Sequence, residues 1–403
     1  MGIAATRLMW DCRRATWCEA ASAASTAGIT MLEIGAVFTL LGLLSFVALK
    51  LKISSVPLFL MAGLALGKGG FVPLDLSEEF LNVGAEIGAL LLLLVLGFEY
   101  SARELVDTMK KRWHAGVIDF LLNALPAAGM ALVLGYGPLG ALAFAGIMFV
   151  SSSGIASQLI RETGWARSNV AKRTTGVLVF QDLALAPYLP ILVASTLGIG
   201  VLGGLISVAV ALGVTSGVFL IALGRELPGL RTLAHQGPGV LLLLVFGAAL
   251  AAAGVSNLVG FSGAVAAFLV GMLLTGEVAE SLRSRFAPLR DIFSAIFFLF
   301  FGLTIDYRDV LAVLPIALIF SIVGVAGKFA VGWWVGRDMT DHMSWKRIGA
   351  FLSSRGEFSM IIASTVAADA ALSNIKEITL GIVVLTALTS TLAIRAFRSR
   401  FEH

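Results

Sequence analysis

The chain has 403 residues, of which 58% are hydrophobic and only 13% are charged, and its formal net charge is +4. Average soluble domains are about 45–50% apolar and about 25% charged, so this composition excludes an ordinary soluble protein. The basic residues are spread between apolar blocks and form no single basic patch, which argues against a nucleic-acid partner.

Residues 1–30 differ from the rest of the chain because they are basic and small-residue-rich without the unbroken apolar core of a signal peptide. We expect an N-terminal arm here. It is either an over-called start, with Met31 as the biological first residue, or a disordered arm in cytosol or periplasm. Cys12 and Cys18 have a spacing that fits no familiar metal motif, so no metal or cofactor is expected.

From residue 33 onward, apolar blocks of about 17–25 residues recur, and each can cross a bilayer as a helix. The pattern predicts an all-α membrane protein with about 13 transmembrane helices in a domain over residues 31–396, followed by a short cytoplasmic tail at 397–403. The predicted spans are 33–49, 53–67, 81–98, 114–134, 138–158, 174–197, 199–223, 238–254, 258–275, 290–305, 309–336, 348–368 and 376–394.

The positions of lysine and arginine test this division. Of the 29 lysines and arginines, 21 fall in the loops after odd-numbered spans or in the tail, whereas the loops after even-numbered spans hold only Lys68, Arg308 and Lys376. A miscounted span would invert the alternation from that point onward. By the positive-inside rule, the N-terminus is expected outside and the C-terminus in the cytoplasm of a cell inner membrane.

Thirteen spans divide into two groups of six joined by a linker helix, which is the inverted repeat of many secondary transporters. The predicted repeats are 33–197 and 238–394, with 199–223 as the linker. Corresponding helices carry polar, glycine-containing interruptions at residues 151–154 and 353–357. Matched interruptions indicate a binding site, because non-helical backbone at membrane depth survives where it lines a cavity or is buried in protein. Small residues for tight helix packing are the alternative.

Few ionisable residues lie well inside the spans, and each costs about 2.5–3.5 kcal/mol at the bilayer centre. Most of them lie about seven to ten residues, roughly 10–15 Å, from the nearest cytoplasmic basic residue, which is close to the midplane. This layer holds the break at Ser152 and Ser153, and the charged residues Asp119, Asp182, Lys328, Arg355 and Glu357. Glu86 lies toward the outer end of its span and is expected at a packing surface or interface.

Asp182 is the expected site of ion and proton binding, together with Gln181, Ser152 and Ser153. A carboxylate that is partly removed from water can hold either a proton or a cation, which is the minimal chemistry of an exchanger. The alternative is a structural aspartate paired permanently with Lys328 or Arg355.

The remaining charges are expected to support this site. Lys328 and Arg355 would be counter-charges for Asp119 and Glu357, although Lys328 could also join the proton cycle, because buried lysines shift readily. Asp119 is either a partner of the site or an interfacial carboxylate.

Over roughly residues 31–395, the chain resembles the Kef-type branch of bacterial monovalent cation:proton antiporters (cation:proton antiporter-2). The segments that carry the likeness are Ala85–Glu99, Ser151–Ala156, Phe180–Asp182, Ser262–Gly271, Phe297–Gly302 and Arg355–Ser359. The resemblance implies a homodimer in which spans 4–6 and 11–13 form a mobile core that exposes Asp182 to alternate sides. It also implies K⁺ in preference to Na⁺.

Gln181 stands where electrogenic members of the family carry a second acid, so the resemblance implies one proton exchanged per cation. Two features depart from the family. Residues 67–70 lack its usual Gly-Pro pair, which puts that turn in doubt. Kef-type proteins usually continue into a nucleotide-binding regulatory domain, whereas this sequence stops at His403, so any ligand gating would need a separate cytoplasmic subunit.

Two other classes of function stay open. A gated cation channel on the same scaffold would need a continuous pore. A membrane receptor or an intramembrane enzyme is the other, although His114, His235 and His342 all fall in predicted cytoplasmic loops and offer no catalytic constellation.

Overall fold

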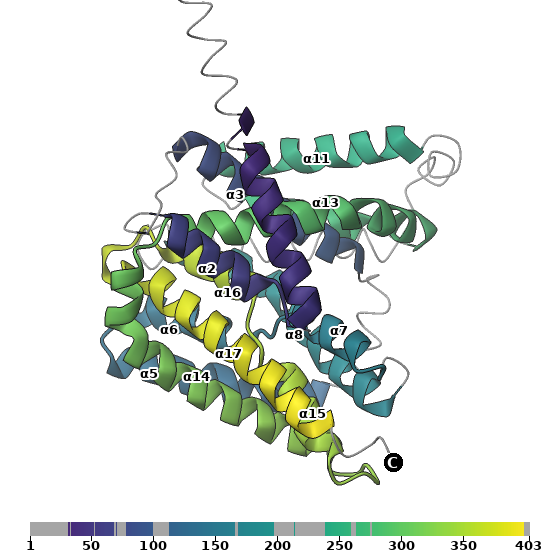
Figure 1. The fold of residues 1–403 in the computed structure, drawn as a ribbon, viewed down its shortest axis with the longest axis vertical. Helices are drawn as coiled ribbons and strands as arrows, with labels where there is room; N and C mark the ends of the chain where they lie inside the picture. The colour runs from purple at the N-terminus through teal and green to yellow at the C-terminus, as the bar shows by residue number, and fades with distance from the viewer. Residues whose placement is uncertain are drawn as a thin grey trace, which may run out of the picture. The chain divides into compact units, whose positions relative to one another are not determined.

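The computed structural model describes residues 31–32, 34–51, 53–67, 70, 78–99, 113–165, 168–196, 213, 238–258, 263–274 and 276–398. These residues form helices and connecting turns, with no β-strand among them (Figure 1). The α-helices are α2 Val56–Leu66, α3 Glu78–Glu99, α5 Leu125–Val133, α6 Gly137–Phe149, α7 Ser153–Glu162, α8 Asn169–Thr196, α11 Pro238–Leu258, α12 Gly263–Leu273, α13 Gly276–Leu303, α14 Tyr307–Gly336, α15 Ser344–Ser353, α16 Glu357–Val366 and α17 Ile375–Arg398.

The chain divides into two units, residues 1–51 and 52–403. The described part of the first unit is an apolar helix that includes Ile34–Leu51. The predicted arm at residues 1–30, the linker span at 199–223 and the tail at 399–403 lie outside the described residues.

The all-helical membrane fold predicted from the sequence is confirmed. Eight helices in the described part are long and apolar enough to cross a membrane. Apart from 199–223, every predicted span coincides with a described helix or with a pair of shorter ones, as at α6/α7 and α15/α16. The total of about 13 is not confirmed, because the linker span is not described.

One predicted boundary is wrong. The span expected at 290–305 begins at Gly276 instead, as α13, so Arg283 and Arg285 lie on a helix and not in a loop. The reason is an amphipathic first half: Leu282 and Phe286 are fully buried four residues apart, while the two arginines are exposed. In the sequence alone, the charged residues on the exposed face of this helix look like those of a loop between two spans.

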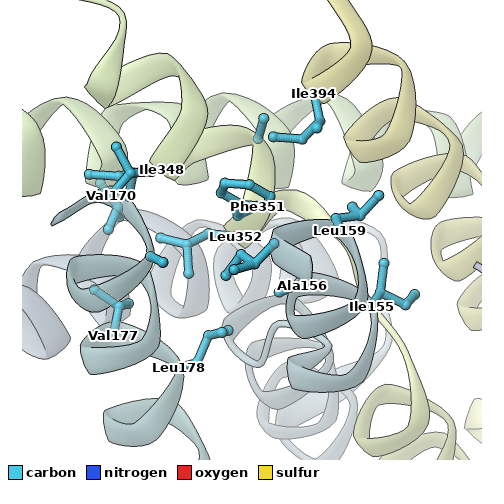
Figure 2. Close-up of a cluster of buried hydrophobic side chains, with 14 of the residues drawn as sticks. Ile155, Ala156, Leu159, Val170, Val177, Leu178, Ile348, Phe351, Leu352 and Ile394 are labelled. Atoms are coloured by element: carbon cyan, nitrogen blue, oxygen red, sulfur yellow. The ribbon is translucent and has the colours of Figure 1, made fainter. Parts of the chain in front are cut away.

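Within the second unit, the helices pack as two groups. In one, α13 packs along α2 and α3, and α12 packs between α3 and α11. In the other, α14 packs on α15 and α17, and α16 packs on α6. An apolar cluster joins α7, α8, α15 and α17, with Phe351 and Leu352 between Leu159, Val177 and Ile394 (Figure 2). This cluster anchors both broken helices beside the polar residues described next.

Candidate functional site

The two predicted interruptions are real breaks, and they lie against each other. Residues 150–152 separate α6 from α7, and residues 354–356 separate α15 from α16. The backbone N–H of Ser152 donates to the carbonyl of Ser354 at 2.8 Å, and Ser151 Oγ donates to the carbonyl of Leu352 at 2.6 Å. Each break therefore satisfies backbone groups of the other, as buried non-helical backbone requires.

Two cations satisfy the carbonyls at the end of α6, which have no partner within the helix. Lys328 Nζ donates to the carbonyl of Phe149 at 2.6 Å, and Arg355 Nη2 donates to that of Met148 at 2.6 Å. Positive charge is favourable at a helix C-terminus, because the helix dipole is negative there. Lys328 and Arg355 thus hold the first break in place.

Arg355 also binds the second break. Its Nη1 donates to the carbonyls of Leu352 at 3.3 Å and Ser353 at 3.1 Å, and its backbone N–H donates to Thr386 Oγ1 at 3.0 Å. This differs from the expected counter-charge role, since Arg355 forms no ion pair with Glu357 in the described part of the chain. The physical reason is that two adjacent breaks leave several carbonyls without helical partners.

Asp119 and Lys328 form a fully buried ion pair. Lys328 Nζ lies 2.7 Å from Oδ1 and 2.9 Å from Oδ2 of Asp119, and both side chains are 0% exposed. Asn123 Nδ2 donates to Oδ1 at 2.8 Å, and Gln181 Nε2 donates to Oδ2. Asp119 is therefore buried within the protein and hydrogen-bonded to Gln181.

Gln181 joins this ion pair to the first break. Besides donating to Asp119, its side-chain Oε1 accepts the backbone N–H of Ser151 at 2.8 Å. Asp182 is the next residue on α8 and is only 1% exposed. The carboxylate of Asp182 therefore lies deep in the protein. Its neighbour Gln181 is held in place because both its amide oxygen and its amide nitrogen are hydrogen-bonded.

The predicted serines and Glu357 lie at the two helix breaks, Ser152 and Ser153 where α7 begins and Glu357 where α16 begins. Ser152 is 1% exposed, and its Oγ donates to Glu357 Oε2 at 2.9 Å. Ser153 is the first residue of α7 and is partly exposed. Glu86 is exposed on α3, away from this network.

Sequence reasoning missed three polar residues that complete the network. Asn123 lies in a π-helical turn, Phe120–Ala124, which directly follows Asp119. Ser359 Oγ donates to the carbonyl of Ile147 at 3.0 Å, and Thr386 accepts from the broken backbone. The available signal was a polar residue within an otherwise apolar stretch, as with Asn123.

Taken together, these residues place the buried carboxylate of Asp182 next to Gln181, which joins a buried ion pair to the first of two adjoining helix breaks. Hydroxyl, carbonyl and carboxylate oxygens are suitable ligands for an alkali cation, and a buried titratable carboxylate can carry a proton. Paired broken helices at membrane depth are the architecture of a secondary transporter. The fold and the site therefore define the class as an ion-coupled membrane transporter and not an enzyme.

Residues 36–397 match the family described as "Sodium/hydrogen exchanger, transmembrane". This match covers most of the sequence, so the chain belongs to the sodium/hydrogen exchanger family, and its predicted Kef-type resemblance is confirmed.

Relatives and a solved structure agree with this assignment. The K⁺/H⁺ antiporter subunit KhtU of Bacillus subtilis is 30% identical over 82% of this chain and 84% of its own length. The ammonium/H⁺ antiporter subunit AmhT of Alkalihalophilus pseudofirmus is 29% identical over 84% and 86%. The solved structure of the sodium proton antiporter MjNhaP1 from Methanocaldococcus jannaschii superposes with a TM-score of 0.66 at 20% identity, covering 91% of this chain and 95% of that one, and shows the shared fold.

Proposed function

We propose that this chain exchanges a monovalent cation, K⁺ in preference to Na⁺, for a proton by alternating access at Asp182. The observation that carries the proposal is the burial of Asp182 beside the crossing, at 1% exposure, next to an ion pair that already balances Lys328. An ionisable residue at membrane depth is costly and marks an ion or proton pathway. The name of the relative KhtU, a K⁺/H⁺ antiporter subunit, supports a monovalent cation as the substrate.

The same contacts support an electroneutral cycle. Both carboxylate oxygens of Asp119 contact Lys328, so the lysine charge is balanced without Asp182. Gln181 contributes a neutral amide at the position beside Asp182. One proton replaced by one monovalent cation at Asp182 then leaves the net charge of the site unchanged. Exchange in liposomes should therefore generate no membrane voltage, and a measured voltage would contradict this stoichiometry.

The proposal extends to the assembly and orientation. We infer a homodimer in the cell inner membrane, with the N-terminus outside and the C-terminus cytoplasmic, as the distribution of lysine and arginine favours. A separate regulatory subunit is supported by the names of KhtU and AmhT, both of which are called antiporter subunits.

Proton flux in everted membrane vesicles tests the central step. Addition of K⁺, Rb⁺ or Na⁺ to vesicles with an established proton gradient should dissipate that gradient with wild-type protein, and most strongly with K⁺. Asp182→Asn should abolish the response because the amide cannot carry the proton. Asp309→Asn, which removes an exposed carboxylate at the start of α14, is the matched control and should keep the response. Cation-dependent flux retained in Asp182→Asn would overturn the proposal.

A further inference from the structure

Glu357 is the buried acid that the network leaves without a counter-charge. It is 9% exposed, and its Oε2 accepts a hydrogen bond from Ser152 Oγ at 2.9 Å. In the described part of the chain no ion pair reaches it, and Arg355, two residues away, directs its guanidinium to carbonyls instead. Its Oε1 accepts no hydrogen bond there. A nearly buried carboxylate that makes one hydrogen bond and no ion pair requires an explanation.

Gly154 leaves space beside that oxygen. A Cβ placed on Gly154 would lie 3.5 Å from Glu357 Oε1 and 3.9 Å from Ser152 Oγ, and apart from its chain neighbours and the backbone of its own helix it would meet no other atom within 4 Å. Gly154 is itself exposed, so this side of the crossing is open. The space is bordered by one carboxylate oxygen and one hydroxyl oxygen.

A further oxygen at the crossing lacks a partner. Ser354, whose carbonyl accepts from Ser152 N–H, is 0% exposed, and its Oγ has no hydrogen-bond partner in the described residues. Hydroxyl and carboxylate oxygens are hard ligands of the kind that replace the water of an alkali cation.

We propose that Glu357 and Ser152 form a second cation site, which holds a partly dehydrated monovalent cation on its way to or from Asp182. This inference rests on the proposed function, because the passing ion is its substrate. The site is expected to be weak. Glu357 begins α16, and the positive end of the helix dipole, about half an elementary charge, offsets part of the carboxylate's attraction for a cation. Weak binding suits a transit site, from which the ion must also leave.

Thermal unfolding of the purified full-length chain in detergent, at increasing K⁺ and constant ionic strength, separates the two sites. Ligand that binds the folded protein raises its unfolding temperature. Asp182→Asn should retain a K⁺-dependent rise, and Asp182→Asn with Glu357→Gln should lose it. Glutamine can still accept from Ser152, so the crossing stays closed. Asp182→Asn with Glu280→Gln, which removes an exposed carboxylate on α13, is the matched control and should keep the rise. A K⁺ response in the double variant equal to that of Asp182→Asn would overturn the proposal.

Gly154→Ala provides a second variant that does not depend on removing a charge. The added methyl fits at ordinary contact distance and narrows the space beside Glu357 Oε1. In the Asp182→Asn background it should raise the K⁺ concentration for half the thermal shift by about threefold or more, since a contact to a charged group weakens. An unchanged K⁺ requirement would contradict the site. If K⁺ binds at both Asp182 and Glu357 but the protein exchanges no cation for protons, only the proposed function is contradicted. If the protein exchanges K⁺ for protons but binds K⁺ at Asp182 alone, only this inference is contradicted.

Discussion

Two regions of residues 52–403 are held together by different contacts: the packing of α2 and α3 on α12 and α13, and the breaks at α6/α7 and α15/α16. Where α2 and α3 meet α13 and α12, glycines allow the backbones to touch: a Cβ on Gly63 would lie 2.8 Å from Gly302 Cα, and one on Gly97 would lie 2.7 Å from Gly271 Cα. No charged residue on these helices is buried among those whose burial is described. At the crossing of α6/α7 with α15/α16, buried charges and hydrogen bonds make the contacts instead.

This difference has a mechanical consequence. Backbones in direct contact leave no alternative arrangement, so the glycine-packed helices suit a rigid scaffold. Hydrogen bonds between side chains and carbonyls are discrete and can exchange partners, which suits helices that move during transport. The following variants test whether each region depends on its own kind of contact.

The largest effect is expected at the buried ion pair. Lys328→Met leaves Asp119 buried without its counter-charge, which should cost about 3–5 kcal/mol of unfolding free energy. Lys328→Met combined with Asp119→Leu removes both charges and should cost less than the single change, although the Phe149 carbonyl still loses its donor. Denaturant titration of the two variants in detergent provides the comparison. A double variant as unstable as the single one would show that the pair is not the stabilising element.

A smaller effect is expected in the glycine-packed region. Gly302→Ala places a methyl 2.9 Å from Gly63 Cα and 3.0 Å from Leu64 N, and because these are backbone atoms the helices must separate. The expected cost is about 1–3 kcal/mol. Gly247→Ala on α11, where nothing lies within 4 Å, is the matched control and should be neutral or slightly stabilising. Equal unfolding temperatures for the two variants would argue against close backbone packing.

Thr386→Val tests the backbone of the second break. The valine keeps the shape of the side chain but leaves the Arg355 N–H without its acceptor, at an expected cost of about 1–2 kcal/mol. Thr389→Val, an exposed residue on the same helix, is the control. Identical denaturation midpoints would mean that the bond to Thr386 does not support the break.

The smallest effect is expected at the surface. The bidentate hydrogen bond from Arg173 lowers the pKa of Asp338 from its ordinary value. A carboxyl with a lowered pKa in the folded state contributes stability at neutral pH, and this contribution is lost as pH falls through the folded pKa. Asp338→Asn should therefore reduce the unfolding temperature slightly near neutral pH, and the difference should vanish in acid. A difference that does not change with pH would contradict this assignment.

The sequence predicted most of this architecture because the signals are local. Apolar blocks, basic loops and the polar breaks at residues 151–154 and 353–357 each appear in the linear pattern. The start of α13 was missed because an amphipathic surface helix and a charged loop have similar composition.

The partners of the charges could not be predicted in the same way. Depth along a helix placed Lys328, Asp119 and Arg355 in one layer but gave no rotation about the helix axis, and rotation decides which groups meet. Asn123 was missed for a related reason, because its bond to Asp119 depends on a local π-helical turn.

Competition between a proton and K⁺ at Asp182 is the central claim, and proton release on K⁺ binding measures it directly. Adding K⁺ to purified protein in weakly buffered solution, at a pH where Asp182 is protonated, should release about one proton per chain, because two ligands that exclude each other are reciprocally linked. Asp182→Asn should release none, and Asp309→Asn should behave as wild type. Undiminished proton release from Asp182→Asn would contradict the account.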